Sequence, residues 1–231
     1  MTMYVGENND YSREMRLRIS PEHNAFLVEE EKPGGIIAYK EISPTELYFA
    51  INNSYVCTDL LHSGMLPEHC LSIAMNSSEK RFVLWYPERY ADLIYRETEL
   101  PHFPIPRMVF AIRMLDTGRV VDCAMGVVDD EPPTPETRMY HYPLANVHPD
   151  ARVCTGNNVM PKYKNPLALR HFPRYLLGLP CNDDLFDRNH NRKGLDHRAL
   201  LEHLRDKPPE YYYTDILVPN GSTLNDFISR R

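Results

Sequence analysis

Residues 140–157 read Tyr-His-Tyr-Pro-Leu-Ala-Asn-Val-His-Pro-Asp-Ala-Arg-Val-Cys-Thr-Gly-Asn and form the most informative stretch of the chain. The stretch follows a run of predicted strands and then leaves regular structure, with Cys154 between a valine and Thr-Gly. A cysteine in an accessible loop can act as a nucleophile, whereas a core cysteine is usually inert. Asn146 lies eight residues upstream, where its amide is a candidate to stabilise an oxyanion at the thiol. A structural cysteine and a turn-forming asparagine are the alternative interpretation.

The sequence predicts strands before this stretch and a helix after it. Residues 108–114 and 120–128 predict a strand pair around Asp116-Thr117-Gly118, and residues 138–142 predict a further strand. After an irregular region, the apolar spacing of residues 195–205 predicts a helix. Strands followed by helices are typical of the α+β class.

The first hundred residues read as a β-rich region. Residues 25–30 and 36–41 predict a hairpin, and residues 55–61 predict a short helix. Further strands are expected at 70–75, 81–86 and 91–96. Three prolines within residues 100–106 suggest a boundary or a rigid crossover. We therefore expect a β-rich N-terminal region over residues 1–100 and a core with the cysteine loop and C-terminal helices over residues 101–231.

Composition narrows the function classes. The chain has 231 residues with 26 Lys and Arg against 32 Asp and Glu, a net charge of −6, which gives no basic surface for nucleic acid or an anionic membrane. No apolar run approaches the ~20 residues needed to cross a bilayer, and the N-terminus lacks a signal-peptide pattern, so we expect a cytoplasmic protein. The phosphate-loop, dinucleotide, G-x-S-x-G and H-E-x-x-H motifs are all absent, so no cofactor or metal is predicted.

The cysteines support a reducing environment. They are odd in number, scattered and never in a C-x-x-C pair, which argues against a disulfide framework and a structural zinc site. Apart from Cys154, four cysteines have apolar or strand contexts: Cys57, Cys70, Cys123 and Cys181. Of these, only Cys181, which follows a proline, is a rival for a chemical role.

The segment around Cys154 resembles the active-site region of ubiquitin-conjugating enzymes, in which the asparagine of a His-Pro-Asn motif lies eight residues before the catalytic cysteine. Asn146 and Cys154 keep that spacing, but Leu144-Ala145 replaces the His-Pro. More specifically, the chain resembles the prokaryotic ubiquitin-conjugating-like family D and, within it, members of PRTRC systems. The resembling pieces are MLP and CL within 65–71, VLWYP at 83–87, PIPRMVF at 104–110, YPLANV at 142–147, RVCTGN at 152–157 and LVPNGSTL at 217–224.

This resemblance implies a fold and a reaction. The fold would be an antiparallel β-meander, an active-site loop and C-terminal helices. Cys154 would accept a ubiquitin-like C-terminus as a thioester, and Asn146 would support the oxyanion. Family members carry a histidine after the cysteine, for which His190 is the best positional match, with Asp187 as its partner, and His171 is the rival.

The resemblance also implies partners. Family members sit beside genes for an activating enzyme, a ubiquitin-like protein and a deubiquitinase-type metalloprotease. An ATP-dependent activating enzyme is needed because nothing in this chain predicts ATP binding. Two alternatives stay open: a non-catalytic module that recruits a ubiquitin-like protein or activating enzyme, and a cysteine hydrolase using Cys154, His171 or His190, and an aspartate.

Overall fold

The computed structural model describes residues 2–4, 14–19, 26–32, 36–54, 63–76 and 78–230. The chain divides into two compact units, Met1–His62 and Ser63–Arg231. The boundary expected near residue 100 therefore falls inside the second unit. The physical reason is strand pairing, because β6 (Glu79–Tyr86) pairs along its whole length with β9 (Met108–Leu115).

The described residues of the first unit form a four-stranded antiparallel sheet and one helix. Its strands are β1 (Thr2–Tyr4), β2 (Glu14–Ile19), β3 (Phe26–Lys32) and β4 (Ile36–Ile42), paired in that order. The β3–β4 pairing confirms the predicted hairpin. Helix α1 (Pro44–Ser54) begins at a capping box between Ser43 and Glu46, whereas the helix predicted at residues 55–61 lies outside the described residues.

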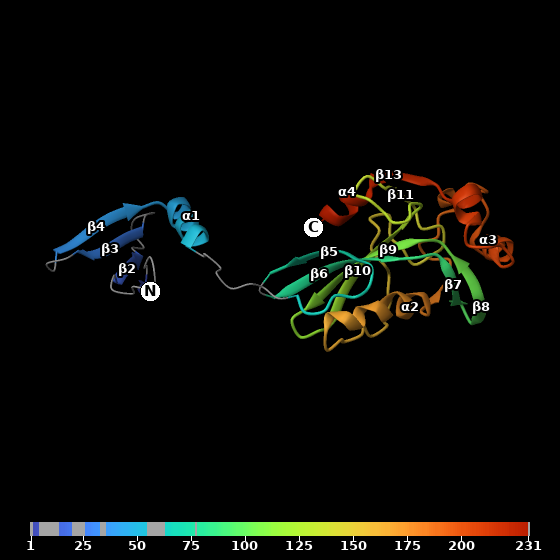
Figure 1. Ribbon diagram of the computed structural model, residues 1–231, viewed down its shortest axis with the longest axis horizontal. Coiled ribbons are helices and arrows are strands. Elements are labelled where there is room, and N and C mark those ends of the chain that lie inside the picture. The colour runs from blue at the N-terminus through green and yellow to red at the C-terminus, as the bar shows by residue number, and fades with distance from the viewer. Residues whose placement is uncertain are drawn as a thin grey trace. The chain divides into compact units, whose positions relative to one another are not determined.

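The second unit is built on a curled six-stranded antiparallel sheet (Figure 1). Its order is β13 (Pro219–Thr223), β11 (Arg138–Tyr140), β10 (Val120–Val128), β9, β6 and β5 (Cys70–Met75). The strands expected at 70–75, 81–86, 108–114, 120–128 and 138–142 are confirmed. The turn around Gly118 joins β9 to β10, as the sequence predicts.

A smaller sheet lies beside the large one (Figure 1). It has the order β12 (Pro180–Cys181), β7 (Arg89–Tyr95) and β8 (Thr98–Ile105). The strand expected at residues 91–96 is β7, but the proline-rich segment at residues 100–106 is a strand rather than a linker. Prolines are tolerated in β8 because it is an edge strand that pairs only with β7.

Short helices follow the strands, which confirms the α+β class. They are η1 (Pro166–His171), α2 (Phe172–Leu177), η2 (Arg188–His190), α3 (His197–Leu204), the π-helical turn η3 (Tyr212–Ile216) and α4 (Leu224–Ser229). Helix α3 confirms the helix predicted at residues 195–205, and the Asp196 side chain caps it by accepting from Ala199 N.

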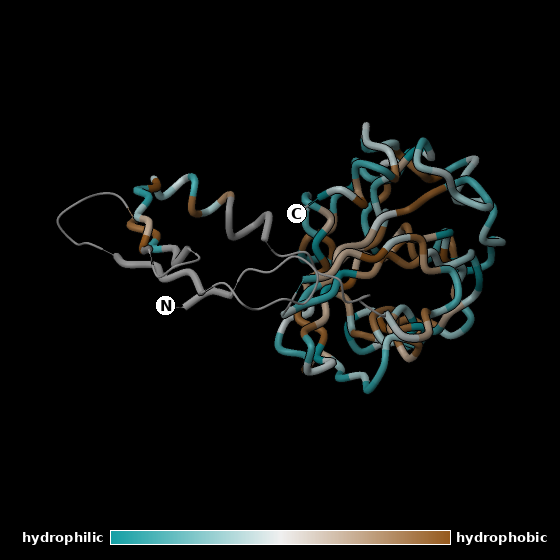
Figure 2. The backbone as a smooth tube through the Cα atoms, turned by 60° about the vertical axis from the view of Figure 1, so that its left-hand side comes forward, coloured by the Kyte–Doolittle hydropathy of each residue, from teal (hydrophilic) through white to brown (hydrophobic). Residues whose placement is uncertain are grey.

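The two faces of the large sheet are covered by different helices. Residues alternate along each strand, so Phe82 and Leu84 belong to the larger core together with side chains of α2 and α3. Val83 points the other way and packs with Leu224 and Phe227 of α4. Apolar segments accordingly concentrate inside this unit (Figure 2). Among the described residues, no helix is long and apolar enough to cross a membrane.

Candidate active site

The irregular segment between β11 and η1 is tied to the sheet at both ends. Strand β11 pairs with β10 at Val127 and Val128. Residues 151–153 then pair with the next part of β10 along the same edge. Met125 N donates to Ala151 O at 2.9 Å, and Val153 N donates to Cys123 O at 2.8 Å. These bonds place Cys154 at the edge of the large sheet.

The far end of the segment is held by the β9–β10 turn. Val120 N donates to Pro161 O at 3.0 Å, and Tyr163 N donates to Gly118 O at 2.8 Å. Gly118 has φ +82, and a Cβ there would lie 2.0 Å from Tyr163 O. Only glycine allows this close approach of the two backbones.

Asn146 and Cys154 face each other across a tight hairpin. Cys154 N donates to Asn146 O at 2.7 Å, and His148 N donates to Arg152 O at 2.8 Å, with a bridge between Val147 and Val153. The turn closes with Ala151 N donating to His148 O at 2.9 Å. The eight residues that separate Asn146 from Cys154 in the sequence therefore correspond to the length of this hairpin.

The side chain of Asn146 holds a second connection. Its Nδ2 donates to Pro180 O at 3.1 Å, which ties the hairpin to β12. The residue has φ +67, a left-handed conformation that asparagine adopts more readily than most residues. A side-chain amide carries two N–H donors, and the second one makes no hydrogen bond to a described residue.

The Cys154 thiol borders a small cavity of about 40 Å³, which we call the thiol cavity. Its lining residues are apolar apart from Tyr142, Asn146, Cys154 and Cys181. The apolar lining residues are Leu93, Ile94, Met125, Leu144, Ala145, Val153, Leu176, Leu177 and Leu179. Leu144 and Ala145, which stand where the resembling motif has His-Pro, are buried.

In three other described cysteines, burial favours the protonated thiol over the thiolate. Burial raises the pKa of the Cys181 thiol to about 11 and that of Cys123 well above its ordinary value. Burial also raises the pKa of Cys70. Cys154 itself is a free, half-buried cysteine at the end of the hairpin.

His190 and Asp187 belong to a different group of residues. The His190 ring stacks on His141, with centroids 4.0 Å apart and planes 9° from parallel. Nε2 of His190 lies 3.7 Å from Oδ2 of Asp187, whose Oδ1 caps η2 by accepting from Asn189 N at 2.8 Å. That backbone hydrogen bond lowers the pKa of Asp187. Among the described residues, no hydrogen bond or ion pair joins His190 to Cys154.

His171, the rival histidine, is exposed at the end of η1. Its Nε2 accepts from Arg170 Nε at 3.2 Å. None of the described groups of His, Cys, Asp and Glu side chains is arranged to hold a metal ion.

Sequence reasoning missed the group around Asp183. The carboxylate accepts from Tyr95 Oη at 2.8 Å, lies 3.1 Å from Nδ1 of buried His197 and pairs with Arg96. The hydrogen bond from Tyr95 is the largest of the effects that lower the pKa of Asp183. No local sequence pattern indicates this group, because Tyr95 and His197 lie about a hundred residues apart in the chain.

Comparison with known families places the chain. A family model described as Prokaryotic E2 family D matches residues 47–219. The chain belongs to this family. No curated protein and no solved structure matches it.

The match to Prokaryotic E2 family D confirms the resemblance noted in the sequence and widens it at the N-terminal side. It begins within α1, crosses the division between the two units and ends at the first residue of β13. The hairpin and η2 both lie inside the matched range. Membership indicates a ubiquitin-conjugating-like role of the transferase type, with ubiquitin-like proteins and activating enzymes as the general class of partner.

Proposed function

We propose that this chain is a ubiquitin-conjugating-like carrier that accepts a ubiquitin-like protein as a thioester on Cys154 and passes it to an amine. Family membership supports the reaction class. The observation that carries the residue assignment is the hairpin, whose backbone hydrogen bond from Cys154 N to Asn146 O sets the two residues opposite each other at its open end.

The loading step is a transthioesterification. The Cys154 sulfur, as a thiolate, attacks the carbonyl carbon that joins the modifier to a cysteine of an ATP-dependent activating enzyme. The new carbon–sulfur bond forms, the old one breaks, and the released thiolate takes up the proton that Cys154 gave up. In the second step an amine attacks the same carbon, loses a proton and releases Cys154.

Asn146 is the proposed oxyanion donor in both steps. The hydrogen bond to Pro180 O fixes the amide in place, and the second N–H is free to bind the negative oxygen of the tetrahedral intermediate. A donor already fixed in place is effective because it needs no reorganisation during the reaction.

His190, assisted by Asp187, is the proposed group that helps to remove a proton from the acceptor amine. Because His190 borders a different pocket from Cys154, this role requires an acceptor that reaches from one pocket to the other. The N-terminal unit is the proposed docking region for the activating enzyme or the modifier. Membership of a PRTRC system and a cytoplasmic location stay predictions.

One observation favours a second function, a non-catalytic module that recruits a ubiquitin-like protein or an activating enzyme. The thiol cavity is small and mostly apolar, and the His-Pro of the resembling motif is replaced by buried Leu144 and Ala145. The hydrolase alternative has less support, since no described hydrogen bond joins a histidine to Cys154.

The test is intact mass spectrometry of the full chain mixed with a candidate activating enzyme, its ubiquitin-like partner and ATP. The carrier proposal expects an adduct that a thiol reductant removes. Cys154→Ala should abolish the adduct, and the matched control Cys181→Ala should retain it. Cys154→Ser should give an adduct that resists the reductant, because an oxygen ester forms in place of the thioester. Complex formation with no adduct would overturn the carrier proposal in favour of the binding module.

A further inference from the structure

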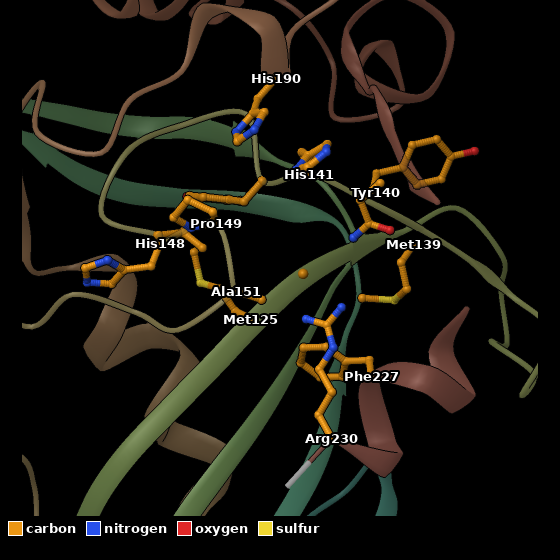
Figure 3. Close-up of a pocket in the computed structure, with 14 residues that line it drawn as sticks. Met125, Met139, Tyr140, His141, His148, Pro149, Ala151, His190, Phe227 and Arg230 are labelled. Carbon is orange, nitrogen blue, oxygen red and sulfur yellow. The ribbon is translucent and has the colours of Figure 1, made fainter. Parts of the chain in front are cut away.

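A second pocket also borders the hairpin, with a volume of about 90 Å³, and we call it the histidine pocket (Figure 3). It is built by β10, β11, the hairpin, η2, β13 and α4. Its polar lining side chains are His141, His148, His190, Asn220, Arg230 and the tyrosines Tyr140 and Tyr142. No aspartate or glutamate is among the described residues that line it.

The stacked histidines supply ring N–H donors at one side of the pocket (Figure 3). The His141 ring makes no hydrogen bond to a described residue, and His190 has only the distant carboxylate of Asp187, 3.7 Å away. Burial, followed by the positive charge of His190, lowers the pKa of His141, while Asp187 opposes that shift. Two imidazolium rings stacked this closely repel each other, and Asp187 offsets that repulsion only in part at His141, so a further anion beside the rings favours the protonated form of His141.

Further donors come from β13 and the end of α4. The Arg230 guanidinium points toward the histidine pair (Figure 3), and its one hydrogen bond to a described residue is the long contact from Nη1 to Asp150 O, 3.4 Å. The carboxylate of Asp226 lies within electrostatic range of Arg230 but does not line the pocket. Oδ1 of Asn220 accepts from Ser222 N and Ser222 Oγ, which leaves the amide N–H groups of Asn220 as donors.

We propose that the histidine pocket binds an oxyanion, a carboxylate or a phosphate group, between the His141–His190 pair and Arg230. A guanidinium, an amide and two imidazoles line this pocket, and no carboxylate side chain of a described residue lines it. A bound oxyanion stabilises the imidazolium form of His141, so binding takes up a proton and strengthens as the pH falls.

This inference does not depend on thioester formation. The pocket shares Met125 and Tyr142 with the thiol cavity, so an acidic group bound there would lie on the opposite side of the same wall from Cys154. The ligand has two possible sources, a free phosphate and an acidic side chain of a bound protein.

The experiment is isothermal titration calorimetry of the full chain with three probes: inorganic phosphate, acetate and a short capped peptide with one glutamate. Each titration is run at about pH 6 and about pH 8, and in two buffers of different ionisation enthalpy. We expect saturable binding, tighter at the lower pH, with proton uptake. Tighter binding of phosphate assigns the free-anion source, and tighter binding of the peptide assigns the side-chain source.

Matched variants decide whether this pocket is the site. Because each removes one charge-assisted hydrogen bond, His190→Gln and Arg230→Gln should each weaken binding about tenfold at the lower pH. Arg205→Gln, at an exposed arginine beyond α3, is the control and should bind as the unmodified chain does. Absence of saturable binding by all three probes, or equal binding by all three variants, would overturn the proposal.

Discussion

The thiol cavity and the histidine pocket both border one hairpin and share two lining residues, Met125 and Tyr142, but the chemical character of their other lining residues differs. One is a small apolar cavity with two thiols, and the other is lined by imidazoles, an amide and a guanidinium. The cysteine and the histidine that the sequence suggested as one site are therefore divided between two pockets. Chemistry that links them must come from a partner large enough to reach both.

The largest expected effect comes from removing the shared wall. Tyr142 is buried between the two pockets, so Tyr142→Ala should cost about 3–5 kcal/mol of unfolding free energy in a urea titration, as large-to-small core substitutions do. Tyr142→Phe is the control and should cost less than about 1.5 kcal/mol, because the hydroxyl makes no hydrogen bond to a described residue. Equal losses for the two variants would contradict the role of the ring as a wall.

Asn146 tests the thiol side of the comparison. Asn146→Gly keeps a residue that tolerates the left-handed backbone but removes the amide, so discharge of the thioester to an amine should slow about 100-fold. The measurement is single-turnover discharge of the loaded carrier, with a thermal melt of the same sample to show that the fold is kept. Discharge at the unmodified rate would remove Asn146 from the proposed mechanism.

The hairpin shows what the sequence can and cannot predict about this site. The pairing of Asn146 with Cys154 was predictable, because an eight-residue spacing and turn-forming residues are local features. The stacking of His190 on His141 was not, since it depends on how η2 folds back beside the end of β11, which lies nearly fifty residues earlier in the chain. The absence of the His-Pro pair was visible in the sequence, but the burial of Leu144 and Ala145 was not.

The fold also has elements that the sequence predicts and elements that it does not. Short apolar runs bounded by turn residues predicted the central strands correctly, since a strand that is covered on both faces, such as β9, is apolar along most of its length. Helix α1 was missed although Ser43 and Glu46 form a readable capping box. Strand β8 was misread because prolines usually interrupt sheets, and only its position at a sheet edge makes them acceptable.

The third prediction separates the two thiols of the thiol cavity. Because burial raises the pKa of Cys181 to about 11, two units above its ordinary value, its thiolate fraction near neutral pH is about 100-fold lower than that of a free cysteine. Alkylation of Cys181 with iodoacetamide should be slowed by a similar factor and should accelerate as the pH rises toward 11. Peptide mass spectrometry over a pH series measures this, and the Cys154→Ala variant provides Cys181 without competition. Rapid labelling of Cys181 at neutral pH would revive it as the rival nucleophile.

The smallest expected effect concerns the histidine pocket. Burial and the charge of His190 hold the pKa of His141 below its ordinary value, so the fold favours the neutral ring. As the pH falls below about 6.5, the unfolded chain takes up this proton first, and stability decreases. NMR titration of the His141 ring proton should give a midpoint below about 6.5 without added anion. A midpoint at or above that value would contradict the assignment, and His141→Gln should reduce the acid-induced loss in urea titrations.

The close approach of Gly118 and Tyr163 has a consequence for how the cysteine segment opens. With residues 151–153 bound to β10 and Tyr163 bound to the β9–β10 turn, both ends of the segment share the exchange behaviour of the sheet. The residues between them, including exposed Gly156 and Asn157, form the part that can rearrange without breaking the sheet. In native-state hydrogen exchange, the amides of Val153 and Tyr163 should therefore exchange slowly, while those of Gly156 and Asn157 exchange rapidly. A protein that docks beside Cys154 would then be detected first by slower exchange of this short span.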